Sequence, residues 1–363
     1  MIKVLTIIGA RPQLIKARCI SSQILRTKNV VERVVHTGQH YDINMSENFM
    51  TLFPKKTDVI NLDIQGINTT DSISKMMIGI SSEILTFKPT LVLIYGDTNS
   101  TLSGALAASK NEIPIVHIEG GVRNFDMKIP EEVNRVVSDR LSDMIFCSSN
   151  KSLENLKNEG FDNFETDIVK TDDLLTDSVF QLIKDIRRNN IFKDTFSHII
   201  PNKYVLLTIH RKLSLSEECL FDVFGAINEL AKDYNFVFPM HPNTSNRLQE
   251  KKIKLSEKIS CISPQNYENM LALIDNCFAV ITDSGGVQRE AYLLKKKSLL
   301  VLGYTPWEEL VHNQCASVCN VNKASVISGW RKMLHLSPSF DTQLYGNGNG
   351  AKQIIDKIIK KFS

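Results

Sequence analysis

The sequence has no long apolar run that could cross a membrane and no recognisable secretion signal. Its apolar stretches, such as Val4–Ile8 and Leu91–Ile94, are far shorter than the ~20 residues that span a bilayer. Arg11 and Lys16 follow the first stretch, where a signal peptide would carry its cleavage site. We therefore expect a cytoplasmic protein without membrane insertion.

The sequence also lacks a large excess of positive or negative charge. The 43 Lys and Arg residues against 40 Asp and Glu residues give a net charge of +3, and the one run of three basic residues is Lys295–Lys297. A nucleic-acid-binding protein would need a basic face with interleaved aromatic side chains. We therefore expect no nucleic-acid partner.

Cysteine usage excludes a disulfide framework and the common zinc sites. The seven cysteines are an odd number and none of them forms a C-x-x-C pair, whereas oxidised frameworks and zinc sites favour even numbers or close pairs. Cys147 and Cys277 lie beside apolar runs and are most simply buried core residues. We expect no metal site.

Short apolar runs followed by polar or glycine-containing breaks recur along the chain, with helix-like segments between them. In the first half such runs cover residues 3–8, 31–35, 91–95, 113–118 and 144–147, and in the second half residues 204–208, 236–238, 279–282 and 299–302. Runs without polar alternation indicate strands buried on both faces of a parallel sheet. Two doubly wound, Rossmann-like α/β domains follow as the expected fold.

The crossing between these domains is expected in the helix-like and polar stretch 172–203. We predict an N-terminal domain over residues 1–171 and a C-terminal domain over 172–350. Apolar residues at helical spacing over 351–362 predict an amphipathic terminal helix, which we expect to pack back on the N-terminal domain.

Ligands of open parallel sheets bind beyond the carboxyl ends of the strands, and the most distinctive polar residues of this sequence gather at those places. The strongest local signal is Thr282-Asp-Ser-Gly-Gly286 with Glu290 four residues later. Two glycines at a helix start suit a phosphate, and the glutamate suits an attached sugar hydroxyl. Neither a Walker loop nor a G-x-G-x-x-G fingerprint is present, which disfavours hydride transfer with a dinucleotide.

Carboxylates form a second group, made of Asp97, Glu119 and the pair Glu131–Glu132. Pro130 precedes the pair, so the two glutamates are also typical of a helix start, where acids offset the helix dipole. Several carboxylates facing a bound sugar nucleotide would serve proton transfer at a sugar carbon. Both interpretations of Glu131 and Glu132 stay open from sequence.

A set of ordered motifs over essentially the whole chain resembles the non-hydrolysing UDP-N-acetylglucosamine 2-epimerases of bacterial cell-envelope polysaccharide biosynthesis. The motifs are Gly9-Ala-Arg-Pro-Gln13, His36-Thr-Gly-Gln-His40, Gly96-Asp-Thr-Asn-Ser-Thr101, His117-Ile-Glu-Gly-Gly121, Pro130-Glu-Glu-Val-Asn-Arg135, His210-Arg211, His241-Pro-Asn243, Thr282-Asp-Ser-Gly-Gly-Val-Gln-Arg-Glu290 and Tyr345-Gly-Asn-Gly348.

The resemblance implies a two-domain fold of the GT-B type, with the active site in the cleft between the domains. It also implies an isomerase that needs neither metal nor NAD and inverts C2 of UDP-GlcNAc, giving UDP-ManNAc. UDP is eliminated to leave a 2-acetamidoglucal and is then added back. A homodimer, and UDP-GlcNAc acting as an activator, are implied as well.

Residue roles follow from the same resemblance. The implied catalytic residues are Asp97, Glu119, Glu131 and His210. The implied substrate-binding residues are Arg11, Lys16, Arg135, His241, Asn243, Ser284, Gly285, Gly286 and Glu290. Gln39 and His241 match positions implicated in activation.

Departures from the family pattern leave the sugar open. Lys212-Leu-Ser214 replaces the usual acid and amide after His210-Arg211, Leu302 and Pro306 replace an arginine and a glutamate, and Thr171 replaces the crossover glycine. The alternatives are a 2-epimerase of a related UDP-sugar such as UDP-2,3-diacetamido-glucuronate, a hydrolysing 2-epimerase that releases ManNAc and UDP, and a GT-B glycosyltransferase.

Overall fold

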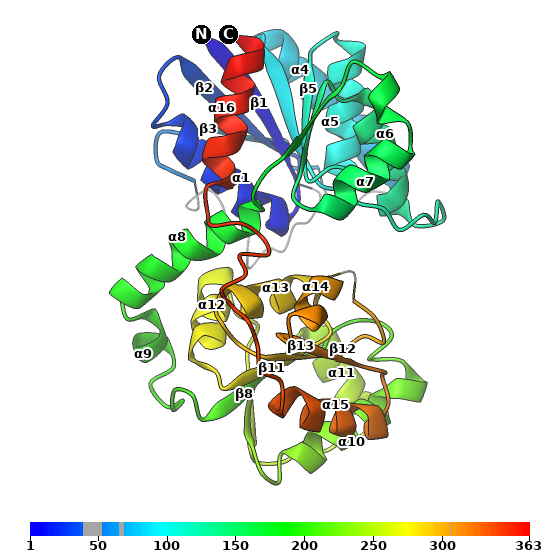
Figure 1. Cartoon of the computed structure of the whole chain (residues 1–363), viewed down its shortest axis with the longest axis vertical. Coiled ribbons are helices and arrows are strands. Elements are labelled where there is room, and N and C mark those ends of the chain that lie inside the picture. The colour runs from blue at the N-terminus through cyan, green and yellow to red at the C-terminus, as the bar shows by residue number, and fades with distance from the viewer. Residues whose placement is uncertain (39–52, 65–68, 306) are drawn as a thin grey trace. The chain divides into compact units, whose positions relative to one another are not determined.

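The computed structural model describes residues 1–38, 53–64, 69–305 and 307–363. These residues form two compact units, one made of Met1–Ser178 with Tyr345–Ser363 and the other of Val179–Leu344 (Figure 1). The boundary after residue 178 lies seven residues beyond the predicted end of the N-terminal domain at residue 171. The boundary after residue 344 lies six residues before the predicted end of the C-terminal domain at residue 350. The first falls inside helix α8 (Leu174–Arg188), whose continuous helical pattern gives no local break in the sequence.

Unit 1 is built on a seven-stranded parallel sheet in the order β3-β2-β1-β4-β5-β6-β7. Its strands are β1 (Ile2–Ile8), β2 (Val30–His36), β3 (Asp58–Asn61), β4 (Leu91–Tyr95), β5 (Ile115–Ile118), β6 (Met144–Cys147) and β7 (Asp167–Lys170). Its helices are α1 (Arg11–Ile24), α4 (Thr69–Phe87), α5 (Asn99–Lys110), α6 (Pro130–Leu141), α7 (Asn150–Asn158), the short 3-10 helix η1 (Phe161–Asn163) and α16 (Gly350–Phe362).

Unit 2 is built on a six-stranded parallel sheet in the order β10-β9-β8-β11-β12-β13. Its strands are β8 (Tyr204–Thr208), β9 (Asn235–Pro239), β10 (Ile259–Ile262), β11 (Ala279–Thr282), β12 (Ser298–Val301) and β13 (Ala316–Cys319). Its helices are α9 (Ile191–Thr195), α10 (Glu217–Leu230), α11 (Pro242–Glu250), α12 (Tyr267–Asn276), α13 (Gly285–Leu293), α14 (Glu308–His312) and α15 (Lys323–Leu334). The predicted fold class, two doubly wound parallel-sheet α/β units, is confirmed.

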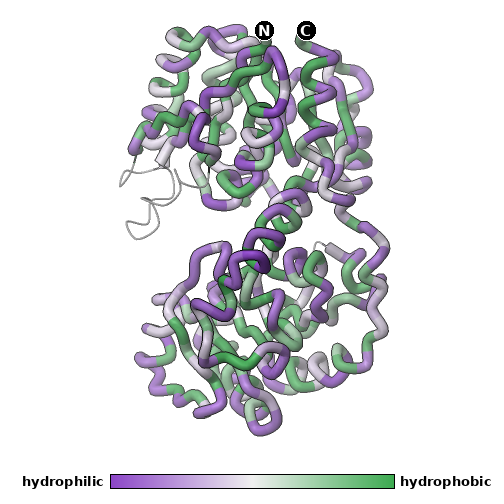
Figure 2. The backbone as a smooth tube through the Cα atoms, turned by 90° about the vertical axis from the view of Figure 1, so that its left-hand side faces the viewer, coloured by the Kyte–Doolittle hydropathy of each residue, from purple (hydrophilic) through white to green (hydrophobic). Residues whose placement is uncertain are grey.

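The central strands are mostly apolar because their residues alternate between two cores. Along β1, Val4 and Ile8 belong to the core that also holds α1 and α16, whereas Leu5 and Ile7 belong to the core that holds α4 and α5. A strand covered by helices on both faces needs an apolar side chain at every position. Most helices, which have only one buried face, alternate hydrophobic and hydrophilic residues (Figure 2).

The terminal helix α16 belongs to unit 1. Ile354, Ile355 and Ile358 are buried in the same core as β1, and both chain ends lie side by side (Figures 1 and 2). Asp177 of α8 accepts hydrogen bonds from the backbone amides of Gly350 and Ala351, both at 3.0 Å, and so holds the start of α16.

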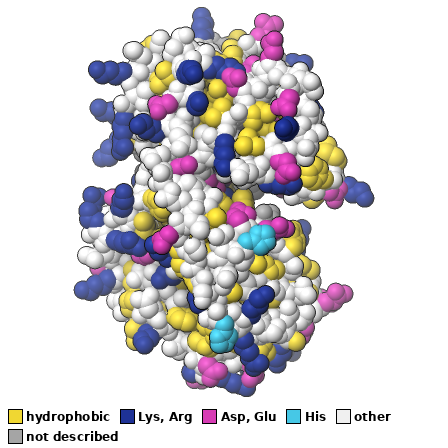
Figure 3. Space-filling model, viewed as in Figure 1, with side chains coloured by type: hydrophobic (Ala, Val, Ile, Leu, Met, Phe, Trp, Pro, Cys, Tyr) yellow, Lys and Arg dark blue, Asp and Glu magenta, His cyan; other side chains and the backbone are white. Residues whose placement is uncertain are grey.

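The distribution of surface charge and the character of the helices bear on the expected absence of nucleic-acid and membrane partners. On the face drawn in Figure 3, Lys and Arg side chains are interspersed with Asp and Glu over both units. Within the described residues, no helix combines the length and the apolar character that a membrane span requires.

One buried carboxyl makes a stability prediction. Glu32 of β2 accepts a hydrogen bond from Thr6 Oγ1 at 2.6 Å, and burial raises the pKa of Glu32 to about 7. The stabilisation that the protonated carboxyl contributes is therefore fully present below about pH 4.5, the pKa of this group in the unfolded chain. It is lost as the pH rises through about 7, the pKa in the folded protein. At about pH 8 we expect Glu32→Gln to raise the free energy of unfolding by about 2–3 kcal/mol.

Urea unfolding at about pH 5 and about pH 8 measures this difference. Glu165→Gln is the matched control, because Glu165 is an exposed glutamate of the same unit. A parallel loss of stability in wild type and Glu32→Gln between the two pH values would contradict the prediction.

Candidate functional site

In unit 1 the candidate residues follow the carboxyl ends of β1, β4 and β5. Strand order reverses between β1 and β4, which is the position where open α/β sheets bind ligands. Arg11 is the first residue of α1, directly after β1, and Asp97 follows β4. Gln13 joins these two loops: its Oε1 accepts from the amides of Gly9 and Ala10, and its Nε2 donates to the β4–α5 loop.

Asp97 is held by an arginine. Arg135 donates from Nε at 3.0 Å and from Nη2 at 2.5 Å to Asp97 Oδ2, while its Nη1 donates to Glu132 at 3.0 Å. The Asp97 side chain keeps 36% of its surface exposed. Both donors converge on one oxygen of Asp97, so the guanidinium anchors Oδ2 and leaves Oδ1 without a bond from Arg135.

Glu119 lies beside the Asp97 loop in a strained backbone conformation. Its φ of 64° is in the left-handed region, which costs energy for a non-glycine residue. Its carboxylate is bonded to Lys16 Nζ. A Cβ placed on Gly96 would lie 3.8 Å from Glu119 Oε2, so Glu119 lies over the peptide next to Asp97.

The two glutamates at the start of α6 have different surroundings. Glu132 is buried and accepts hydrogen bonds from the amides of Asn124 and Phe125 as well as from Arg135. Glu131 is exposed, and no hydrogen bond or ion pair joins it to another described residue. Glu132 is therefore a structural residue of the loop before α6, and Glu131 is the glutamate left available to a ligand.

In unit 2 the candidate residues follow β8, β9 and β11. Asp283, fully buried after β11, accepts hydrogen bonds from the backbone amides of His210 and Arg211 at 2.9–3.1 Å. His210 Nδ1 lies 3.4 Å from the same carboxylate, and 44% of the His210 side chain is exposed. Asp283 thus fixes the loop after β8 and leaves the imidazole of His210 accessible.

The start of α13 presents backbone amides to the same region. Ser284 caps the helix through Val287 N, and Gly285 and Gly286 form its first turn. A Cβ on Gly285 would lie 3.5 Å from Arg211 Nη2, so a guanidinium adjoins these amides. A helix N-terminus beside an arginine is a site for an anion such as a phosphate.

Three further candidates lie near these loops and one cannot be placed. Glu290 is buried on α13, and its Oε1 lies 3.9 Å from the position of a Cβ on Gly286. His241 caps α11, its ring 6.5 Å from that of His210, and its Nδ1 accepts from the amide of Asn243. Gln39 lies outside the described residues, as does Pro306.

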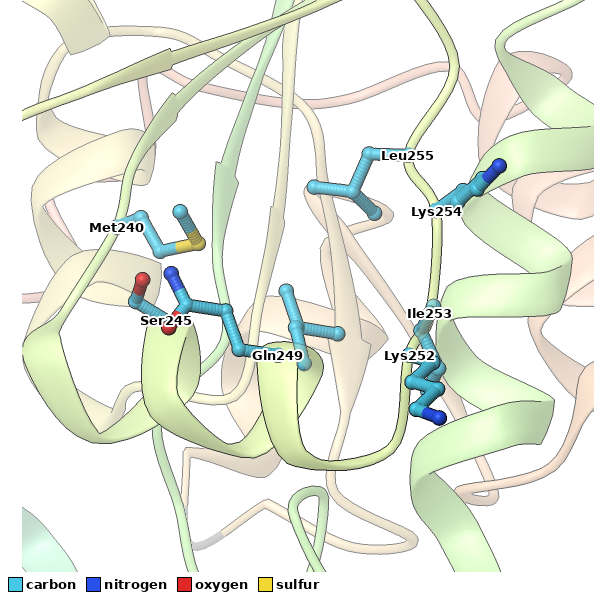
Figure 4. A pocket seen from close by; sticks show the side chains of 8 residues that line it. Met240, Ser245, Gln249, Lys252, Ile253, Lys254 and Leu255 are labelled. Carbon is cyan, nitrogen blue, oxygen red and sulfur yellow. The ribbon is translucent and has the colours of Figure 1, made fainter.

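A cavity of about 440 Å³ lies along α11 in unit 2 (Figure 4). Met240, Ser245 and Gln249 point toward one another at one end of it, and Lys252 and Lys254 lie at the other (Figure 4). None of the candidate site residues lines this cavity. Among the described residues, no group of three or more His, Cys, Asp and Glu side chains is arranged to hold a metal ion.

Residues 22–359 match the family model of UDP-N-acetylglucosamine 2-epimerase. The chain belongs to the UDP-N-acetylglucosamine 2-epimerase family. It is 37% identical over 360 residues to the UDP-2,3-diacetamido-2,3-dideoxy-D-glucuronate 2-epimerase of Pseudomonas aeruginosa, covering 99% of each chain. Named relatives are UDP-sugar 2-epimerases, which confirms the predicted enzyme class, an isomerase.

Solved structures agree with this membership. UDP-GlcNAc 2-epimerase of Methanocaldococcus jannaschii, in complex with UDP-GlcNAc and UDP, matches with a TM-score of 0.85 at 33% identity over 99% of this chain and 100% of that one. UGT2 of Phytolacca americana matches with a TM-score of 0.61 at 10% identity over 99% of both chains. The second likeness shows the fold alone and agrees with the GT-B type expected for the family.

Several residues that organise the site in this family member were not singled out from sequence. Gln13 and Asp283 join loops through backbone amides, and Asp139 of α6 bonds His117 and Arg123. Asp139 gave no local signal, because its neighbours in the sequence, Ser138 and Arg140, are polar. The partners themselves come from other elements and carry no local signal.

Gly120 makes the second prediction. A Cβ there would lie 2.4 Å from both Asp139 Oδ1 and Ile145 Cγ2, too close for either atom to stay in place. We expect Gly120→Ala to lower the free energy of unfolding by about 1–3 kcal/mol, as measured by urea denaturation.

Gly225→Ala is the matched control, because the nearest atom to its Cβ, Lys323 Cδ, is at 3.7 Å and a helical alanine is favoured there by about 0.4–1 kcal/mol. Equal stability of the Gly120→Ala variant and wild type would show that the Asp139 carboxylate can move at no cost.

Proposed function

We propose that the protein interconverts UDP-GlcNAc and UDP-ManNAc by eliminating UDP and adding it back. The observation that carries this proposal is a pair of cation-bound carboxylates that follow the strands β4 and β5 of unit 1, in a member of the 2-epimerase family. Asp97 is bonded to Arg135, and Glu119 is bonded to Lys16. Elimination breaks the bond from C1 to the diphosphate oxygen and removes the proton from C2, which leaves a 2-acetamidoglucal. Re-addition forms the bond from C1 to the diphosphate oxygen again and returns a proton to the opposite face of C2.

Unit 2 would hold the leaving group. Ser284 and the amides of Gly285 and Gly286 at the start of α13, together with His210 and with Arg11 of unit 1, would stabilise the charge that develops on the diphosphate. Glu290 would bind the ribose. His241 and Asn243 would also bind the nucleotide sugar.

Unit 1 would move the proton. Asp97, Glu119 and Glu131 would face the hexose, where carboxylates both exchange the C2 proton and stabilise positive character at C1. Asp97 and Glu119 each already accept a hydrogen bond from a cation, whereas Glu131 has no partner among the described residues. The reaction needs a dry, closed site, because water would trap the glucal or its precursor.

A second candidate substrate is UDP-2,3-diacetamido-2,3-dideoxy-glucuronate. The 37% identity to the Pseudomonas 2-epimerase of that sugar supports it. A panel of both UDP-sugars, compared by kcat/KM, distinguishes the two. A homodimer in the cytoplasm, with UDP-GlcNAc as an activator through Gln39 and His241, completes the proposal.

The central test is hydrogen exchange at C2. We expect UDP-GlcNAc in deuterated water to acquire deuterium at C2 while UDP-ManNAc appears and little UDP is released. Asp97→Asn and Glu131→Gln should abolish this exchange and leave UDP binding nearly intact, because each removes a proton-transfer group and neither lies on the diphosphate loop. Mass spectrometry of the sugar and calorimetry with UDP measure the two properties.

The rival functions give different outcomes. Stoichiometric release of UDP and ManNAc without UDP-ManNAc identifies a hydrolysing enzyme. Absence of exchange with every UDP-sugar of the panel, and turnover only when an acceptor is added, identifies a glycosyltransferase. Glu165→Gln serves as the control that leaves exchange unchanged, since Glu165 is exposed and lies outside every candidate motif.

Diphosphate binding supplies a further prediction. Arg11→Ala should weaken UDP binding by about 1.5–3 kcal/mol, the range for a hydrogen bond to a charged group, as measured by calorimetry. Arg331→Ala, on the exposed side of the last turn of α15, is the control. Equal UDP affinity of the Arg11→Ala variant and wild type would remove Arg11 from the diphosphate site.

A further inference from the structure

The backbone that carries Asp97 is held at three consecutive points. Each carbonyl oxygen from residue 95 to residue 97 accepts a hydrogen bond from a side chain of a different element. The donors are Gln13 Nε2 of α1 at 2.7 Å, His117 Nε2 of β5 at 2.8 Å and Asn134 Nδ2 of α6 at 2.8 Å. Gly96, in the middle, has a φ of 62°. The His117 bond therefore fixes the peptide between Gly96 and Asp97.

The second ring nitrogen of His117 also faces an oxygen. His117 Nδ1 lies 2.7 Å from Asp139 Oδ1, and both side chains are fully buried. Asp139 Oδ2 accepts from Arg123 Nη1 at 2.7 Å and from the amide of Gly121 at 3.0 Å. Burial alone would raise the pKa of Asp139, but His117 and Arg123 outweigh it and hold that pKa below its ordinary value.

Neither neutral form of His117 fits these two contacts. A neutral imidazole has one N–H and one lone pair. With the proton on Nδ1, the lone pair of Nε2 would point at the Gly96 oxygen. With the proton on Nε2, the lone pair of Nδ1 would point at an ionised carboxylate. Only the doubly protonated ring donates to both oxygens.

We propose that His117 is a positioning residue, kept doubly protonated by Asp139, whose Nε2–H fixes the Gly96 peptide and thereby the Asp97 carboxylate. The inference rests on the proposed function for the consequence in turnover. The protonation state itself is independent of the reaction catalysed.

The other charged and titratable groups around the ring leave Asp139 as its carboxylate partner. Arg123, itself a cation, is bonded to Glu159 by two hydrogen bonds at 2.6 and 2.9 Å. Cys147 of β6 also faces this cluster, and burial raises the pKa of its thiol to about 12, so it stays neutral. Among the described residues, Asp139 is thus the carboxylate in contact with the imidazole.

Asp139→Asn tests the second proton of His117 separately from the hydrogen bond that His117 Nε2 donates to the Gly96 carbonyl. The asparagine oxygen can keep the bonds from Arg123 and Gly121 while its amide nitrogen donates to His117 Nδ1. The ring then needs one proton only and keeps Nε2–H on the Gly96 carbonyl. His117→Phe removes both ring bonds, and His198→Phe, at an exposed histidine, is the control.

Long-range 1H–15N spectra of the histidines read the protonation state directly. At about pH 7 we expect both nitrogens of His117 to carry a proton, because each of them faces an oxygen at hydrogen-bond distance, and only Nε2 to carry one in Asp139→Asn. An unprotonated nitrogen on His117 of the wild-type protein at about pH 7 would overturn the proposal, whether or not His117→Phe folds.

Turnover provides the second measurement. His117→Phe should lower kcat about 100-fold, the effect of a misplacement of about 1 Å, with KM and UDP affinity changed less than about twofold. Asp139→Asn should lower kcat less than about tenfold, and His198→Phe should leave it unchanged. Wild-type kcat in a folded His117→Phe variant overturns the positioning role. An inactive wild type with a doubly protonated His117 would instead refute the proposed function alone.

Discussion

The structure depends on hydrogen bonds to the loops that follow β1 and β4 in unit 1 and β8 and β11 in unit 2, where the strand order of each sheet reverses. An unpaired buried amide or carbonyl in these loops would cost about as much as a lost hydrogen bond. In each unit, one side chain joins two of these loops. Gln13 joins the loops after β1 and β4, and Asp283 joins the loops after β8 and β11. An amide can both accept and donate, whereas a carboxylate only accepts. Gln13 therefore accepts from amides of one loop and donates to a carbonyl of the other. Asp283 accepts from two amides and also lies 3.4 Å from His210 Nδ1.

This choice decides what each loop offers a ligand. In unit 1, Gln13 occupies the amides of Gly9 and Ala10, and the groups that remain exposed include the carboxylate of Asp97. In unit 2, Asp283 occupies the amides of His210 and Arg211, and the first-turn amides of α13 remain for an anion. The same strand order thus presents acids in one unit and anion-binding donors in the other.

The sequence predicts the central strands well and misses every edge strand. β3, β7, β10 and β13, the outermost strands of the two sheets, were not predicted. A central strand is covered on both faces and reads as a continuous apolar run, as Leu91–Tyr95 does. An edge strand such as Asp167–Lys170 is exposed at both ends, so nothing separates it from a loop. Prediction fails there because neighbours, and not composition, create the strand.

The candidate site shows the same division between local and distant information. Motifs locate Asp97, Glu119 and the start of α13, because their residue types and strand-end positions are local. Residue type and position alone leave Glu131 and Glu132 equivalent, and the family resemblance points to Glu131. In the structure the two side chains differ because the amides of residues 124 and 125 bond to Glu132. Likewise, Leu302 at the end of β12 is buried, where the charge of an arginine would lack water. Its side chain is therefore a packing residue here.

In the proposed reaction, the pairing of Asp97 and Glu119 with cations constrains proton transfer further. A proton that arrives at Asp97 or Glu119 competes with a hydrogen bond from Arg135 or Lys16, whereas one that arrives at Glu131 displaces no bond to the described residues. Two carboxylates held as acceptors and one left unpaired are therefore unequal partners before any substrate binds. A reaction that takes a proton from one face of C2 and returns it to the other needs that inequality, because one group must accept while another donates.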